Sequence, residues 1–226
     1  MTSVKLFFGA AVVALTASAQ SITFSGPLTV NAINPSGTSF AYSGTLTQAA
    51  TISLTASGTA CEQAGSVYCT NAAGVAVVAG AGAGVGQTST FSATFSPTSG
   101  TWNFGALLMN VEGECTVQLF PANASNGLGS GSPPSSLSLN NVSLASLGCP
   151  TFSITSPAIT LFVADSNYPD NSQGFTVTSG ARSPTPSPTP LPSTLLLSMV
   201  GLAALAVFAA SSRFFLGNLG SNAARR

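Results

Sequence analysis

Apolar and hydroxyl-bearing side chains alternate along much of the chain between residues 20 and 181. In one such run, Ile52 and Leu54 alternate with Ser53 and Thr55. A period of two places one set of side chains on a core and the other in solvent, as in a half-buried β-strand. The pattern predicts strands at residues 22–25, 52–55, 91–95, 115–119, 137–139, 152–154, 159–163 and 175–177.

Turn-forming residues separate these predicted strands. Clusters of Gly, Pro, Asn and Ser occur between them at spacings typical of β-sandwiches. The region has no convincing 3.6-residue amphipathic period, and its Ser and Thr content disfavours helices. The pattern is weakest at 71–86, where Gly and Ala surround three valines and favour a strand with a glycine-rich loop. We expect a mainly β fold, an antiparallel β-sandwich.

The N-terminal segment has the composition of an export signal. Lys5 precedes an apolar run at 6–15, and the small residues Ala17, Ser18 and Ala19 follow this run. The uninterrupted run is about ten residues long, whereas a membrane span needs roughly 20. We therefore expect a signal peptide at 1–19, cleaved after Ala19.

The C-terminal segment has the composition of a membrane anchor. Residues 194–210 carry no charge and are rich in Leu, Ala and Val, and arginines follow at 213, 225 and 226. Counted from Leu191, the uncharged stretch reaches the roughly 20 residues that cross a bilayer, and the arginines favour a cytoplasmic C-terminus. The Pro-rich stretch before it favours an extended spacer. The prediction is an ectodomain at 20–181, a tether at 182–193, a transmembrane helix at 194–212 and a basic tail at 213–226.

The charges of the chain are segregated. All the basic residues lie in the predicted signal, tether or tail: Lys5, Arg182, Arg213, Arg225 and Arg226. All the acids lie in the predicted ectodomain: Glu62, Glu112, Glu114, Asp165 and Asp170. Affinity for nucleic acid comes from Lys and Arg that neutralise phosphates, and the ectodomain has neither, so we exclude nucleic acid as a partner.

The four cysteines, Cys61, Cys69, Cys115 and Cys149, all lie in the predicted ectodomain. This distribution indicates two disulfides formed in an oxidising compartment. Four cysteines allow three pairings. We favour Cys61 with Cys69 and Cys115 with Cys149, because the first pair closes a short loop at little entropic cost. A zinc site is disfavoured, since the chain has no histidine and no Cys-x-x-Cys spacing.

The chain lacks the side chains that serve as the base in most forms of nucleophilic catalysis. There is no histidine and, once the signal is removed, no lysine, which excludes Ser-His-Asp and Cys-His arrangements. A glycosidase-type pair needs two carboxylates, and the candidates are Glu112, Glu114, Asp165 and Asp170; on a strand Glu112 and Glu114 would share a face. A solvated turn beside Cys115 is the competing interpretation for the glutamates. We expect no enzymatic activity.

One loop concentrates side-chain oxygens. Asp165, Asn167, Asp170 and Asn171 lie within seven residues of one another, as a calcium site requires. The competing interpretation is that these residues cap a turn around Pro169. We expect no cofactor, with calcium at this loop as the alternative.

The junction between tether and span carries a recognisable motif: Pro190, Leu191, Pro192, Ser193 and Thr194, then an apolar span, then Arg213. It resembles the C-terminal sorting signal of the bacterial PEP-CTERM family, although Leu191 stands where that family has glutamate. The resemblance covers about the last 35 residues. It implies recognition by an exosortase, which would cut near the motif and leave the ectodomain in the envelope or exopolysaccharide matrix.

Residues 191–194 also match the first four positions of a sortase signal, and a lipid-anchor signal is a third reading. We expect an exported envelope or matrix protein with a structural or adhesive role, at the extracellular face. Its expected partners are the membrane, an exosortase-type enzyme and polysaccharide. The alternative is a carbohydrate-binding or carbohydrate-cleaving sandwich, in which Trp102, Phe104 and Tyr168 are candidate sugar platforms. Strand spacing favours a core position for Trp102 and Phe104.

Overall fold

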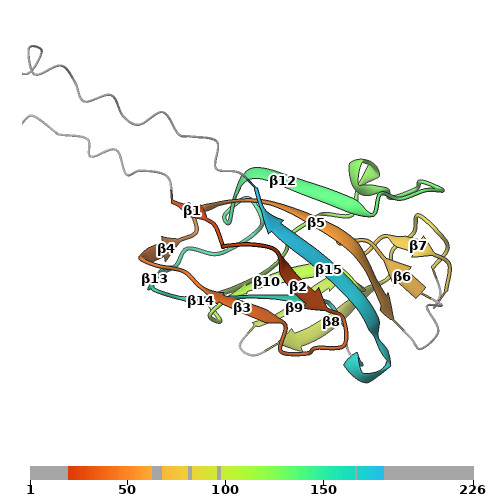
Figure 1. Ribbon diagram of the computed structural model, residues 1–226, viewed down its shortest axis with the longest axis horizontal. Helices are drawn as coiled ribbons and strands as arrows, with labels where there is room; N and C mark the ends of the chain where they lie inside the picture. The colour runs from red at the N-terminus through yellow and green to blue at the C-terminus, as the bar shows by residue number, and fades with distance from the viewer. Residues whose placement is uncertain (1–19, 63–67, 81–82, 96–97, 166, 181–226) are drawn as a thin grey trace, which may run out of the picture. The chain divides into compact units, whose positions relative to one another are not determined.

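The computed structural model describes residues 20–62, 68–80, 83–95, 98–165 and 167–180 (Figure 1). The chain divides into two units, Met1–Ala181 and Arg182–Arg226, and all the described residues belong to the first. The predicted signal peptide, tether, sorting motif, span at 194–212 and tail lie outside the described residues. Within the residues that are described, no helix is long and apolar enough to cross a membrane.

The described residues form fifteen strands and two short 3-10 turns. The strands are β1 (Ser21–Ile22), β2 (Leu28–Asn31), β3 (Thr38–Ala41), β4 (Thr45–Thr47), β5 (Thr51–Glu62), β6 (Tyr68–Thr70), β7 (Ala76–Val78), β8 (Thr90–Phe95), β9 (Thr98–Asn103), β10 (Leu107–Val111), β11 (Cys115–Gln118), β12 (Ser136–Ser143), β13 (Ser153–Thr155), β14 (Ala158–Val163) and β15 (Ser172–Ser179). The 3-10 turns are η1 (Ala124–Asn126) and η2 (Tyr168–Asp170). The predicted mainly β, antiparallel fold is confirmed, and among the strand pairs of the described residues only the short β1–β5 pairing is parallel.

Two sheets face each other. The larger has the order β2-β15-β5-β6-β7, with β1 and β12 also paired to β5, and the smaller has the order β11-β10-β14-β3. The twelve-residue strand β5 organises the larger sheet. It pairs with β15 and β1 along one edge and with β12 and β6 along the other. Two antiparallel two-stranded sheets, β4–β13 and β8–β9, complete the fold (Figure 1).

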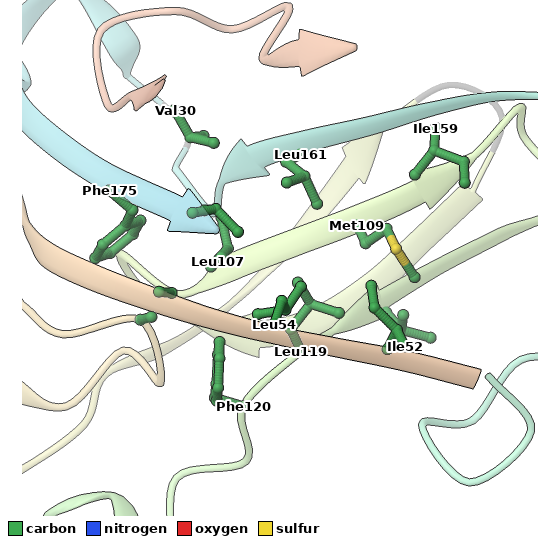
Figure 2. Close-up of a cluster of buried hydrophobic side chains, with 14 of the residues drawn as sticks. Val30, Ile52, Leu54, Leu107, Met109, Leu119, Phe120, Ile159, Leu161 and Phe175 are labelled. Atoms are coloured by element: carbon green, nitrogen blue, oxygen red, sulfur yellow. The ribbon is translucent and has the colours of Figure 1, made fainter. Parts of the chain in front are cut away.

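The main core lies between the two sheets. Figure 2 shows side chains of β5 and β15 meeting those of β10 and β14. Those that meet there are at most 1 % exposed and include Ile52, Leu54, Phe175, Leu107, Met109, Ile159 and Leu161. Burying a side chain of this size contributes roughly 1.5–3 kcal/mol relative to leaving it in water. The apolar half of the alternating pattern therefore supplies the core.

Strand β10 was not predicted, because its sequence, Leu-Leu-Met-Asn-Val, does not alternate between apolar and polar side chains. Leu107, Leu108, Met109 and Val111 are all buried. Leu107 and Met109 belong to the main core, whereas Leu108 packs with Trp102 of β9 in a second cluster on the other face of the smaller sheet. Both faces of β10 are thus covered, which removes the period-two pattern. The core position predicted for Trp102 is confirmed.

Two other predicted strands are shorter in the structure than their sequence patterns. The strand expected at 22–25 is only β1, since the chain leaves the sheet before Gly26, which has a φ of 72°. Phe24 instead stacks on Phe40, with ring centroids 5.0 Å apart. The strand expected within 71–86 is present as β7, followed by glycine-rich turns.

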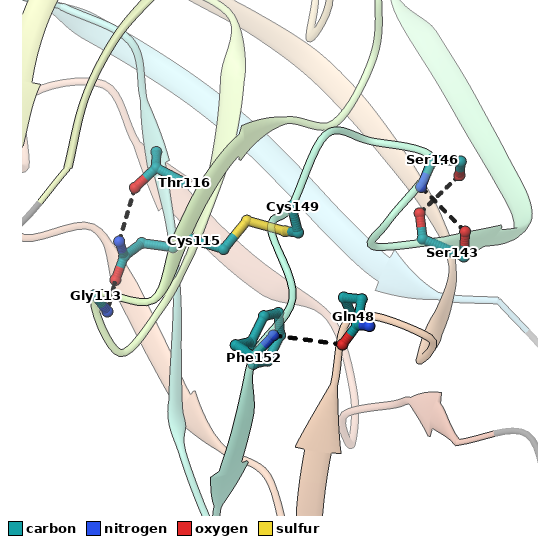
Figure 3. The surroundings of a disulfide bond; sticks show 9 residues. Gln48, Gly113, Cys115, Thr116, Ser143, Ser146, Cys149 and Phe152 are labelled. Atoms are coloured by element: carbon teal, nitrogen blue, oxygen red, sulfur yellow. Dashed lines mark hydrogen bonds between the residues drawn. A yellow bond between two sulfur atoms is a disulfide. The ribbon is translucent and has the colours of Figure 1, made fainter. Parts of the chain in front are cut away.

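Both predicted disulfides are confirmed. Cys61 and Cys69 are direct register partners on β5 and β6. Cys115 begins β11 of the smaller sheet, and Cys149 lies in the loop after β12 of the larger sheet, so this bridge links the two sheets (Figure 3). The same loop is closed by two hydrogen bonds between Ser143 and Ser146.

The two ends of the described domain lie together on β5. The N–H of Thr51 donates to the carbonyl of Gln20 at 2.8 Å, and the N–H of Gly180 donates to the carbonyl of Ser53 at 2.7 Å. The Gln20 side chain also accepts from the N–H of Thr47 at 3.2 Å. Gln20 is therefore fixed by the fold. Gly180, at the other end of the described domain, is bonded to the same end of β5.

A buried asparagine joins three separate segments. Asn71 is fully buried, and its Oδ1 accepts from the N–H groups of Ala73 and Val75 at 3.0 and 3.2 Å. Its Nδ2 donates to the carbonyls of Asn126 and Pro134 at 2.9 and 3.0 Å. This one side chain fixes the turn before β7 and holds the long β11–β12 connection against it.

Candidate functional site on the larger sheet

The glutamates considered as a catalytic pair lie in the turn between β10 and β11, and both are exposed. Glu112 has a φ of 36°, so the two residues do not share the face of a strand. The Glu112 carboxylate accepts from the N–H of Ala158 at 3.0 Å. The arrangement is the solvated turn that the sequence offered as the competing interpretation.

The aspartates lie at the opposite end of the smaller sheet. Val111, next to Glu112, pairs with Ile159, whereas Val163, two residues before Asp165, pairs with Leu107. The ladder between these ends spans roughly 13 Å at about 3.3 Å per residue. A glycosidase pair requires carboxyl groups roughly 5–9.5 Å apart. The geometry therefore brings neither glutamate to the aspartates.

The four residues considered for calcium form two amide–carboxylate pairs. Asn171 Nδ2 donates to Asp165 Oδ2 and, at 3.0 Å, to the carbonyl of Ala32, and both side chains are buried. Asn167 donates from its N–H to Asp165 Oδ1 at 3.1 Å and from Nδ2 to Asp170 Oδ2 at 2.7 Å. Amide nitrogens, not amide oxygens, face the carboxylates, which is the arrangement of a hydrogen-bonded turn.

Two further observations concern this loop. Asn171 Oδ1 is buried without a hydrogen-bond partner among the residues described. Among all the residues that the structure describes, there is no group of three or more His, Cys, Asp or Glu side chains that could hold a metal ion. The loop ties the β14–β15 connection to the end of β2, and calcium binding there stays a prediction.

Asp165→Asn is expected to lower the free energy of unfolding by about 2 kcal/mol, because one buried donor then faces an amide N–H₂ group. Urea titration measures the loss. The matched control is Asp170→Asn, whose partially exposed pair with Asn167 predicts a loss of about 0.5 kcal/mol. Equal losses would contradict a structural role specific to Asp165. A calcium-dependent rise in melting temperature in the unsubstituted chain would favour the ion site instead.

The aromatic candidates for sugar binding are also engaged within the fold. Trp102 is 8 % exposed and belongs to the second cluster. Phe104 packs against Tyr68, with ring centroids 5.8 Å apart. The Tyr168 hydroxyl donates to the carbonyl of Val163 at 2.9 Å. Trp102 and Phe104 thus pack in two different apolar clusters, and the Tyr168 hydroxyl is bonded within its own loop region.

The most regular polar surface is the outer face of the larger sheet. Its first row crosses four strands through directly paired residues, Thr29 of β2, Thr176 of β15, Ser57 of β5 and Ser136 of β12. Its second row is Thr178, Thr55 and Ser138 on β15, β5 and β12. We call these seven residues the hydroxyl face. Neighbouring strands lie about 4.8 Å apart and the rows about 6.7 Å apart, so the hydroxyl groups form a two-dimensional array.

The exposure of these side chains follows the alternation along each strand. Thr29, Thr176, Thr178, Ser136 and Ser138 are exposed, while the residues between them point into the core. Thr55 and Ser57, on the central strand, are half-buried. The exposed hydroxyl groups of the face therefore lie on the flanking strands β2, β15 and β12, and the half-buried ones lie on the central strand β5.

Several hydroxyl groups are held by cross-strand hydrogen bonds. Thr55 and Ser138 share one at 2.8 Å, and the Ser57 hydroxyl donates to the carbonyl of Thr176 at 3.4 Å. Next to the array, the Thr59 hydroxyl donates to Gln173 Oε1 at 2.7 Å. These contacts restrict the rotamers of short side chains, four of which in the array belong to β-branched threonine.

The four strands that carry the face contain one ionisable acid, Glu62 at the end of β5, and no Lys or Arg. None of the seven array residues is charged or aromatic. The chain matches no family model, no curated protein and no solved structure.

Proposed function

We propose that the protein is an exported component of the cell envelope or extracellular matrix with a structural or adhesive role and no turnover. The hydroxyl face is the observation that carries this proposal. It is broad, uncharged and built on a disulfide-linked sandwich, which suits lasting contact with a hydrated matrix rather than chemistry at one point. Three observations argue against the carbohydrate-cleaving alternative. Glu112 and Glu114 do not share the face of a strand, both lie far from Asp165 and Asp170, and each aspartate is hydrogen-bonded to an asparagine side chain.

The ends of the chain support the proposed address. A signal peptide cleaved after Ala19 would leave Gln20 as the first residue, and Gln20 is bonded to Thr51 and Thr47. The segment after Gly180 would continue as the tether and then as a transmembrane helix at 194–212. Its sorting motif, Pro190 to Thr194 with Arg213, resembles an exosortase substrate. Two disulfides fit an oxidising compartment outside the cytoplasm.

In cells without an exosortase, deleting residues 190–226 is expected to move the protein from the membrane fraction to the medium, because the deletion removes the apolar span and its arginines. Cell fractionation with immunoblotting measures the distribution. The matched control deletes only 214–226, keeps the span and Arg213, and is expected to stay cell-bound. Retention of the longer deletion on cells would contradict C-terminal anchoring.

Intact-mass measurement of the unsubstituted chain, from cells with and without an exosortase, tests processing at both ends. We expect the mature chain to begin at Gln20. In cells with an exosortase we expect it to end near Pro192, and in cells lacking one to end at Arg226. Equal masses in the two strains would exclude exosortase cleavage while leaving membrane anchoring intact.

A further inference from the structure

We infer that the hydroxyl face is a binding surface for a neutral, hydroxyl-rich polysaccharide, engaged along many sugar units at once. This inference deepens the proposed function by naming the binding face and the chemical class of its partner. The face is separate from the acids and aromatic residues that the sequence suggested for sugar binding. It rests on the register of four strands, which the sequence pattern alone does not give.

Charge restricts the partner first. The array has no cation for a phosphate or a uronic acid and no anion for a basic polymer. The described ectodomain residues carry only acidic charge, which repels polyanions. An uncharged polymer can bind this surface without desolvating a charged group that would then have no partner of opposite charge.

The side-chain types restrict it further. The cores of protein–protein interfaces are enriched in aromatic residues, Met and Arg, and the array has none of these. A second copy of the chain or another protein would therefore find no apolar anchor on it. A polysaccharide presents hydroxyl groups that both donate and accept, and Ser and Thr hydroxyls do the same.

The array also fixes how binding depends on ligand length. Each hydroxyl–hydroxyl contact replaces a contact with water, so its net contribution is small and one sugar gains little. Contacts along a chain add after the first, because the polymer is already held at the surface. The cross-strand bonds of Thr55 and Ser57 limit the rotamer freedom that binding must remove. We expect binding to long or insoluble polymers and none measurable to short oligosaccharides.

The test is co-sedimentation of the full-length chain, kept in a polyoxyethylene detergent whose head group is not a sugar. The probes are microcrystalline cellulose, insoluble starch and an insoluble β-1,3-glucan, with alginate beads as the anionic probe. The unsubstituted protein is expected to sediment with at least one neutral probe and not with alginate. Excess soluble cellopentaose is expected to leave this binding unchanged.

The variant Thr29→Val/Thr176→Val/Thr178→Val removes three exposed hydroxyl groups and keeps β-branched side chains. Its affinity for the bound probe is expected to fall about tenfold. The matched control, Thr23→Val/Thr151→Val/Thr155→Val, changes exposed threonines outside the larger sheet and is expected to bind as the unsubstituted protein does. Melting temperature shows whether both variants are folded. If the triple variant does not fold, the single variant Thr176→Val replaces it and is expected to bind about two- to threefold more weakly than the unsubstituted protein.

Four results would overturn the inference. They are no binding to any neutral probe, equal binding by the face and control variants, binding to cellopentaose as tight as to the polymer, and sedimentation without a polysaccharide. The last would assign the face to a second copy of the chain. The anchoring experiment is independent, so a chain that is released by deletion of 190–226 but binds no probe disproves only the ligand.

Discussion

Replacing Cys115 and Cys149 together with alanine is expected to lower the free energy of unfolding by roughly 4 kcal/mol. The bridge closes a loop with a sequence separation of 34, and its removal enlarges the conformational freedom of the unfolded chain. Both residues are buried, and alanine avoids placing a hydroxyl group in the core. Urea titration of the purified chain measures the effect.

The matched control is the double variant Cys61→Ala/Cys69→Ala. Its loop has a separation of only 8, for which the same relation predicts roughly 2.5 kcal/mol. The β5–β6 ladder already holds these residues opposite each other, whereas Cys115–Cys149 links the two sheets. A larger loss for the Cys61–Cys69 variant would show that loop length does not decide the contribution of these bridges.

Asn71→Ala is expected to cost about 3 kcal/mol, the second largest effect. The substitution leaves the N–H groups of Ala73 and Val75 and the carbonyls of Asn126 and Pro134 without their side-chain partner. Because Asn71 is fully buried, water cannot replace these bonds without opening the turn. Urea titration measures the total loss, and hydrogen exchange shows whether residues 126–134 lose protection first.

Asn71→Asp separates the two sides of this network. It keeps the acceptor for Ala73 and Val75 but removes both donors and brings a carboxylate towards two carbonyls, so its cost is expected to be at least as large. Asn140→Ala, at an exposed position of β12, is the control and is expected to change stability by less than about 0.5 kcal/mol. A loss below about 1 kcal/mol for Asn71→Ala would contradict the joining role.

Local pattern was sufficient where one face of a strand meets solvent. The alternation at 52–55 lies inside β5, and those at 159–163 and 175–177 lie inside β14 and β15. It failed at β10, which is covered on both faces once Trp102 packs on Leu108. The short strands β2, β3, β4 and β6 were also missed, because three or four residues carry too little periodicity and depend on their neighbours in the sheet.

The candidate site shows the same division. The outward positions of Thr55 and Ser57 follow from the alternation, and so do those of Thr176 and Thr178. That Ser57 lies between Thr176 and Ser136 depends on strand pairing across 79 or more residues, which no local signal gives. Asn71 was missed for the same reason, since its partners Asn126 and Pro134 are distant in the chain. The disulfide pairing was accessible because loop length is a property of the sequence.

Gly180 directly follows β15 and is hydrogen-bonded to Ser53 of β5, and this position has a mechanical consequence. A tension applied at the C-terminal end of the domain would act on β15, an inner strand with eight register pairs to β5 and four to β2. Tension along the strand would shear these backbone bonds together instead of opening them one after another. A domain that binds a matrix by one face and is anchored through the segment after β15 would therefore resist unfolding under tension. A domain anchored through an edge strand such as β2 would resist it less.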